Sequence, residues 1–141
     1  WSPSSISYTG NNRTHMIRVP DAGRFELRLM DGSSNPYLLQ AGIVAAGLHG
    51  LNNKINPGEA LTCNMYTDYK NYPNLKKLPN EIEEALDFLQ NSKELKEAFG
   101  DDVITSYIKL KNMEIKDFNK EEKFDKKSSV THWEKNSTLD C

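Results

Sequence analysis

The chain has 141 residues, of which 37% are hydrophobic and 27% charged, and its formal net charge is −2. This length permits one domain with a core of its own. The small negative charge gives no support for a nucleic-acid or membrane partner. Cys63 and Cys141 are the only cysteines and have no CxxC spacing, so we expect neither a disulfide framework nor a zinc site, and a cytoplasmic location.

Short strands are predicted over residues 5–9, 15–19 and 24–29, where β-branched and aromatic residues recur. Gly10-Asn11-Asn12 is a turn signal between the first two strands. Pro20 and Gly23 predict the turn that joins the second and third strands. The N-terminal part is therefore expected to form a small antiparallel sheet.

The strand predicted over 24–29 alternates charged and apolar residues. Arg24, Glu26 and Arg28 occupy every second position, so they share one face. The other face is expected to pack against a core and carries Phe25, Leu27 and Leu29. This pattern is usual for a half-buried strand with a solvated front. It also suits binding, because an Arg–Glu–Arg front can hold anionic oxygens and a metal ion.

A long helix is predicted after Asn35, which can act as an N-cap, and Pro36, which suits the first helical position. The helix is expected to end near Leu51. Its 37–48 stretch carries no charge and is apolar on most faces, which predicts burial on all sides. The apolar run is too short to span a membrane. Residues 52–78 are predicted to be irregular.

Three further helices are predicted after residue 79. The first shows an apolar stripe of Ile82, Leu86 and Leu89. Ser92 can cap the second, and Asp101-Asp102 gives the third an acidic N-terminus. Residues 112–128 carry many charges of both signs and are interpreted as a solvated helix end and a mobile link. A last short helix is predicted around Trp133. The fold class is therefore α+β: short antiparallel strands followed by a helical C-terminal part.

A series of short motifs resembles the glutamine synthetase family, in that family's order and approximate spacing over residues 11–111. The motifs are Asn12-Arg13-Thr14 with Arg18-Val19-Pro20, Arg24-Phe25-Glu26-Leu27-Arg28, Asn35-Pro36-Tyr37-Leu38, Ala46-Gly47-Leu48-His49-Gly50, Asn53-Lys54-Ile55-Asn56-Pro57-Gly58-Glu59, Leu78-Pro79 before Glu84-Ala85-Leu86, and Tyr107-Ile108-Lys109-Leu110-Lys111. The resemblance implies that residues 1–141 are a partial catalytic domain, its C-terminal segment. The start at Trp1 is interpreted as a processed end or an expression boundary.

The resemblance implies an ATP-dependent glutamate–ammonia ligase that forms glutamine through γ-glutamyl phosphate. By position, Arg13, Arg18 and Arg24 are implied to contact ATP and the transferring phosphoryl group. Arg28 is implied to face the glutamate carboxylate and the acyl phosphate, which makes Arg28 and Arg18 the catalytic candidates. Glu26 is implied as a ligand of Mg²⁺ or Mn²⁺. The N-terminal part of the same enzyme would supply the remaining ligands, and the intact enzyme is expected to be a homo-oligomer.

Several positions depart from the family's usual motifs and suggest a divergent branch: Thr14, Gly32 and His49. Lys76 stands where some bacterial members carry a tyrosine that is adenylylated, so that control is expected to be absent. The acceptor therefore stays open between ammonia, methylamine and a polyamine. Two further hypotheses are a non-catalytic assembly or regulatory fragment and an anion- or nucleotide-binding module. The complete set of four arginines and Glu26 favours the enzyme.

Overall fold

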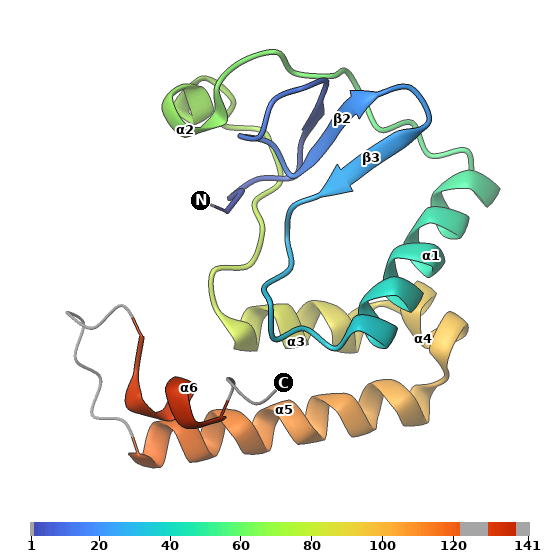
Figure 1. Ribbon diagram of the computed structural model, residues 1–141. Coiled ribbons are helices and arrows are strands. Elements are labelled where there is room, and N and C mark those ends of the chain that lie inside the picture. The colour runs from blue at the N-terminus through green and yellow to red at the C-terminus, as the bar shows by residue number, and fades with distance from the viewer. Residues whose placement is uncertain (1, 122–129, 138–141) are drawn as a thin grey trace. The chain divides into compact units, whose positions relative to one another are not determined.

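The computed structural model describes residues 2–121 and 130–137 (Figure 1). The chain divides into unit 1 (Trp1–Asp31 and Lys54–Ala85) and unit 2 (Gly32–Asn53 and Leu86–Cys141). In chain order the described elements are β1 (Tyr8–Thr9), β2 (Ile17–Asp21), β3 (Arg24–Leu27), α1 (Pro36–Asn52), α2 (Met65–Asp68), the 3₁₀ helix η1 (Tyr69–Asn71), α3 (Ile82–Asn91), α4 (Lys93–Phe99), α5 (Asp101–Glu121) and α6 (His132–Ser137). The predicted α+β class, with strands followed by helices, is confirmed.

Unit 1 contains a three-stranded sheet in the order β1-β2-β3. β2 and β3 are antiparallel, as predicted, with Arg18 opposite Glu26. A register shift between Arg18 and Asp21 marks a bulge, which suits Pro20 because proline has no N–H to give to a ladder. Gly23 closes the hairpin at φ +83°, a left-handed conformation that favours glycine. The hairpin places Arg18 and Glu26 side by side on neighbouring strands.

The first strand pair differs from the prediction, because β1 lies parallel to β2. The cause is the loop between them, which reverses the chain twice. The carbonyl oxygen of Gly10 accepts hydrogen bonds from the N–H groups of Asn12 (2.9 Å) and Val19 (3.2 Å). A second turn follows at residues 13–16, so the chain re-enters the sheet in its original direction. The prediction of antiparallel strands therefore holds for β2 and β3 only.

His15 joins three segments of unit 1. Its ring is fully buried. Nε2–H donates to the carbonyl oxygen of Cys63 (2.9 Å), and Nδ1 is hydrogen-bonded to the hydroxyl of Ser7 (3.0 Å). The ring thus ties the loop before β2 to the segment before β1 and to the chain before α2.

We predict that His15→Ala lowers the free energy of unfolding by about 2–4 kcal/mol, because it opens a cavity and removes the hydrogen bond of the buried Ser7 hydroxyl to the ring. Urea unfolding would measure the change. The matched control is His132→Ala, since His132 is exposed and, among the described residues, its ring is hydrogen-bonded to Asn136 in its own helix. Equal unfolding midpoints for the two variants would contradict the structural role of His15.

The helices begin where local signals predicted. The Asn35 side chain accepts from the N–H groups of Tyr37 and Leu38 at the start of α1. Ser92 Oγ accepts from Leu95 N–H at the start of α4, and Gly100 ends that helix at φ +86°. The predicted irregular stretch 52–78 is wrong in part, because α2 and η1 lie within it. The N-cap signal of Asn64 in this stretch was missed, although its side chain caps α2.

The prediction that α1 is buried on all sides is wrong. None of its residues is buried, and Tyr37 and Leu51 remain 82% and 77% exposed. Val44 and Leu48 are also exposed, at a spacing that aligns them with Tyr37 and Leu51 in one stripe. Within unit 2, α1 packs on α4. An apolar composition predicts burial but does not say whether the covering surface belongs to the same chain.

The charged segment predicted as a link begins inside a helix. Residues 112–121 belong to α5, which runs from Asp101 to Glu121. Residues 122–128 lie outside the described part of the chain. No helix in the described ranges is long and apolar enough to span a membrane.

The predicted short helix around Trp133 is confirmed as α6, and it starts with a capping box. Glu134 N–H donates to Thr131 Oγ1 (3.1 Å), while Glu134 Oε2 accepts from the N–H (2.7 Å) and hydroxyl (2.9 Å) of Thr131. The bonds from Thr131 favour the ionised carboxylate and hold the pKa of Glu134 below its ordinary value.

A depressed carboxyl pKa stabilises the fold above the ordinary pKa, and that stabilisation is lost as the pH falls through the folded-state pKa. We therefore predict that amide-exchange protection of α6 decreases below the ordinary glutamate pKa. Glu134→Gln is the control, because its amide does not titrate. An identical decrease in that variant would show that another group is responsible.

Candidate functional site

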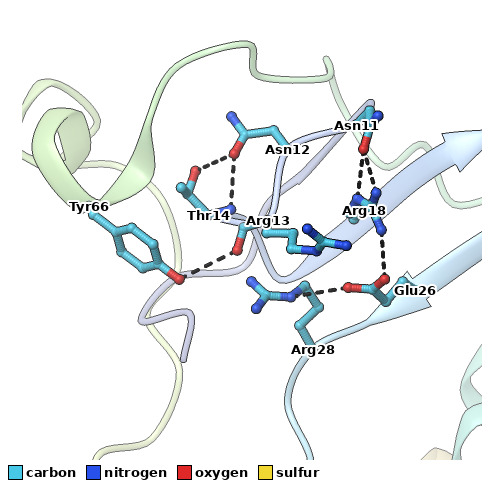
Figure 2. Close-up of polar contacts among 8 residues, drawn as sticks. All are labelled: Asn11, Asn12, Arg13, Thr14, Arg18, Glu26, Arg28 and Tyr66. Carbon is cyan, nitrogen blue, oxygen red and sulfur yellow. Dashed lines mark hydrogen bonds and ion pairs between the residues drawn. The ribbon is translucent and has the colours of Figure 1, made fainter. Parts of the chain in front are cut away.

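Arg18 is a buried arginine on β2, and it is 9% exposed. Its Nη1 donates to Glu26 Oε2 on β3 at 2.8 Å. Its Nε (3.0 Å) and its Nη2 both donate to Oδ1 of Asn11, in the loop after β1. The guanidinium is thus fixed from two sides, by a charged and by a neutral acceptor (Figure 2).

Arg28 approaches the same carboxylate from the other side. Its backbone N–H donates to the carbonyl oxygen of Met16 (2.9 Å), which extends the pairing of β3 by one residue. Its Nε lies 3.2 Å from Glu26 Oε1. Its Nη1 is buried and has no hydrogen-bond partner among the residues that the structure describes. An unsatisfied buried donor is costly, so this nitrogen is suited to an acceptor that comes from outside the described residues.

We name Arg18, Glu26 and Arg28 the arginine cluster. In Figure 2 the Arg13 side chain extends from the loop before β2 in the direction of the cluster. The loop that carries Arg13 is shaped by two motif residues, because Asn12 Oδ1 accepts from both the N–H (3.0 Å) and the hydroxyl (2.8 Å) of Thr14. The two arginines of the cluster exceed its one glutamate in charge, so the cluster favours an anion.

Arg24 is not part of the arginine cluster. Its Nη2 lies 3.3 Å from Asp21 Oδ2 at the end of the hairpin, and its side chain is 67% exposed. Exposed pairs of this kind contribute about 0–1 kcal/mol, which leaves Arg24 available to a ligand. The ion pair between Glu26 and Arg28 confirms that these two share a face.

The predicted core face of this strand is wrong in part. Phe25 is 59% exposed, and Leu29 is exposed as well. The alternation of the strand is present, but the described residues do not cover these two side chains. Period-two patterning gives the side on which a residue lies and not the neighbour that covers it.

The described residues do not form a complete binding site for a divalent cation. Within the described ranges, no three His, Cys, Asp or Glu side chains lie close enough together to hold a metal ion. Both oxygens of Glu26 are engaged by guanidinium groups. Mg²⁺ requires near-octahedral oxygen coordination, so Glu26 fits only one part of a ligand set. Anionic oxygens fit better, because Arg28 Nη1 is a donor without a partner among the described residues, and the Arg18 guanidinium carries more N–H groups than the three that donate to Asn11 and Glu26.

Sequence reasoning missed the part played by Asn11. Asn11 was interpreted only as part of a turn. A turn signal covers a few residues, whereas the partner of Asn11, Arg18, lies seven residues further along the chain. An asparagine in a turn close to a strand arginine is too common a pattern to reveal a specific pair.

Comparison with known proteins assigns the family. The family model "Glutamine synthetase, catalytic domain" matches residues 1–134. The chain belongs to the glutamine synthetase family. It is 46% identical over 140 residues to a glutamine synthetase of Rhizobium meliloti, covering 99% of this chain and 30% of that protein. It is 38% identical over 144 residues to a glutamate–methylamine ligase of Methyloversatilis universalis, with 99% and 30% coverage.

A solved structure agrees with the fold of this glutamine synthetase segment. An ADP complex of GmaS superposes with a TM-score of 0.80 at 40% identity, covering 100% of this chain and 30% of that one. The chain thus spans about a third of the length of the relatives it matches. The predicted resemblance to the C-terminal part of the catalytic domain is confirmed.

Proposed function

We propose that this chain is the C-terminal catalytic segment of an ATP-dependent glutamate–amine ligase, with ammonia as the amine and glutamine as the product. The observation that carries the proposal is the arginine cluster, in which one buried donor of Arg28 has no partner in the described part of the chain. The family match gives this cluster its chemical context. The 1–141 segment is then a partial catalytic domain.

The reaction would transfer the γ-phosphoryl group of ATP to the side-chain carboxylate of glutamate, after which the amine displaces phosphate. Negative charge gathers between phosphate and carboxylate oxygens in both steps. Catalysis of such transfers depends on positioning and on cations around that charge. Arg28 would donate to the glutamate carboxylate and to the acyl phosphate, and Arg18 to the transferring group. Arg13 and Arg24 would bind the phosphates of the nucleotide.

The intact enzyme is proposed to use Mg²⁺ or Mn²⁺, with Glu26 as one carboxylate ligand and the others from the remaining part of the enzyme. That part is also the proposed partner of the exposed stripe on α1, because a row of apolar side chains on one helix face suits burial against further protein. A homo-oligomer and a cytoplasmic location complete the proposal. No role for nucleic acid or membranes is proposed.

The acceptor amine has close alternatives. The relatives include the glutamate–methylamine ligase and, at 35% identity over 137 residues, a γ-glutamylethanolamide synthetase of Streptomyces coelicolor. Methylamine or a polyamine is therefore the second candidate. A non-catalytic assembly or regulatory fragment is less favoured, because such a fragment has no use for an orphan donor beside an ion-paired glutamate.

The test is phosphate release by the intact ligase that contains this segment, with ATP, glutamate and Mg²⁺ or Mn²⁺. Ammonium, methylamine, ethanolamine and a polyamine would be compared at equal concentrations, and the product identified by mass spectrometry. We expect the highest kcat/KM with ammonium. A preference for another amine would reassign the acceptor, and amine-independent hydrolysis alone would refute the ligase.

A further inference from the structure

Asn11 makes an unusual contact for a residue in a turn. One oxygen, Oδ1, accepts from two nitrogens of the same guanidinium, Nε (3.0 Å) and Nη2 of Arg18. Asn11 is itself exposed, whereas Arg18 is buried. Figure 2 shows the Asn11 amide oxygen facing the Arg18 guanidinium. Removing the amide would thus disturb little core packing, and its main consequence would be a change in the orientation of Arg18.

The contact determines which donors of Arg18 remain free. A guanidinium has five N–H groups in a rigid planar fork. Three are used in the hydrogen bonds to Asn11 and Glu26, on Nε, Nη2 and Nη1. The remaining two, on Nη1 and Nη2, are held in a fixed plane. A group held by Glu26 alone could still rotate about that single bond.

The neutral charge of Asn11 matters as well as its geometry. Arg18 already shares Glu26 with Arg28, so one negative charge is spread over two guanidinium groups. A carboxylate at position 11 could accept the same hydrogen bonds. It would also add a second negative charge beside Arg18 and weaken its attraction for a phosphate. An amide orients the guanidinium and leaves its charge available.

We propose that Asn11 is a positioning residue that orients Arg18 toward the transferring phosphoryl group without neutralising it. The inference rests on the proposed function and deepens it. It gives the turn after β1 a part in catalysis, although Asn11 itself is not placed against the substrate.

The test uses three variants of the intact ligase: Asn11→Ala, Asn11→Asp and Arg18→Ala. Asn91→Ala and Asn91→Asp are matched controls, because Asn91 is an exposed asparagine whose side chain, within the described ranges, donates to the Asp87 carbonyl in its own helix. Steady-state kinetics, product inhibition by inorganic phosphate and a thermal melt are measured for each.

We expect Asn11→Ala to lower kcat/KM by about 10–100-fold with little change in Tm, because small misplacements of a positioning group have effects of that order. Asn11→Asp keeps the acceptor, so a purely structural role would be rescued. We expect instead a normal melt together with weaker inhibition by phosphate, since the added charge opposes the anion. The Asn91 variants should match the wild type.

The outcomes separate the inference from the function on which it rests. Wild-type kinetics in Arg18→Ala would refute the proposed part of Arg18 in the ligase reaction. A large loss in Arg18→Ala with wild-type kinetics in both Asn11 variants would overturn the positioning role alone. If Asn11→Ala does not fold, Asn11→Asp decides: wild-type kinetics and phosphate inhibition in that variant would overturn the inference.

Discussion

Arg28→Ala in the intact ligase is expected to lower kcat/KM by about 10²–10³-fold, the cost of removing one donor aimed at charge that develops in the transition state. The free energy of unfolding should change far less. Glu26 keeps its 2.8 Å pair with Arg18 when Arg28 is removed, so no carboxylate is left unpaired. The variant also removes the orphan Nη1, whose burial is unfavourable without a ligand. Steady-state kinetics and a thermal melt would measure the two effects separately.

The control for this variant is Lys96→Ala. Lys96 also forms an ion pair, to Asp101 at 3.4 Å, and both residues belong to unit 2, whereas the arginine cluster belongs to unit 1. Its kcat/KM and Tm should both stay close to the wild type. An unchanged kcat/KM in Arg28→Ala, combined with a collapsed Tm, would instead make Arg28 a structural residue.

Local signals in the sequence were enough to predict most of the secondary structure. These signals act over a few residues: Asn35 before Pro36 at the start of α1, Ser92 at the start of α4 and Gly100 at its end. Each helix starts or stops at the residue that its signal predicted. The pair of Glu26 and Arg28 was predictable for the same reason, because residues two apart in a strand share a face. The family resemblance rested on motifs of this length and was confirmed.

Long-range relations were not predictable from these patterns. The parallel pairing of β1 depends on two successive reversals in the loop after Thr9, and the burial of His15 depends on Cys63, 48 residues further along the chain. The exposure of Tyr37 and Phe25 depends on what covers them, and an apolar pattern carries no information about the source of that cover. The specific roles of Arg13, Arg18, Arg24, Glu26 and Arg28 stay predictions that the proposed variants test.

The 141-residue chain alone is expected not to form glutamine. Its described residues bring one glutamate to the arginine cluster and no set of three metal-ligating side chains, whereas Mg²⁺ needs a nearly complete oxygen shell. The chain also spans only about 30% of its relatives, so most of the wall that would exclude water from the cluster is not supplied by these residues. The arginines would still attract ATP weakly, and salt would screen that contact.

A phosphate-release assay with the purified chain, glutamate, ammonium, ATP and Mg²⁺ or Mn²⁺ measures this directly, with the intact ligase as the positive control. A titration of the chain with ATP at low and high salt forms the second measurement, and we expect weak binding that disappears at high salt. A chain that binds ATP but does not turn over would place the missing chemistry in the rest of the enzyme. Turnover close to that of the intact ligase would show the opposite: one glutamate and four arginines, on a hairpin and its neighbouring loop, would then be a sufficient site.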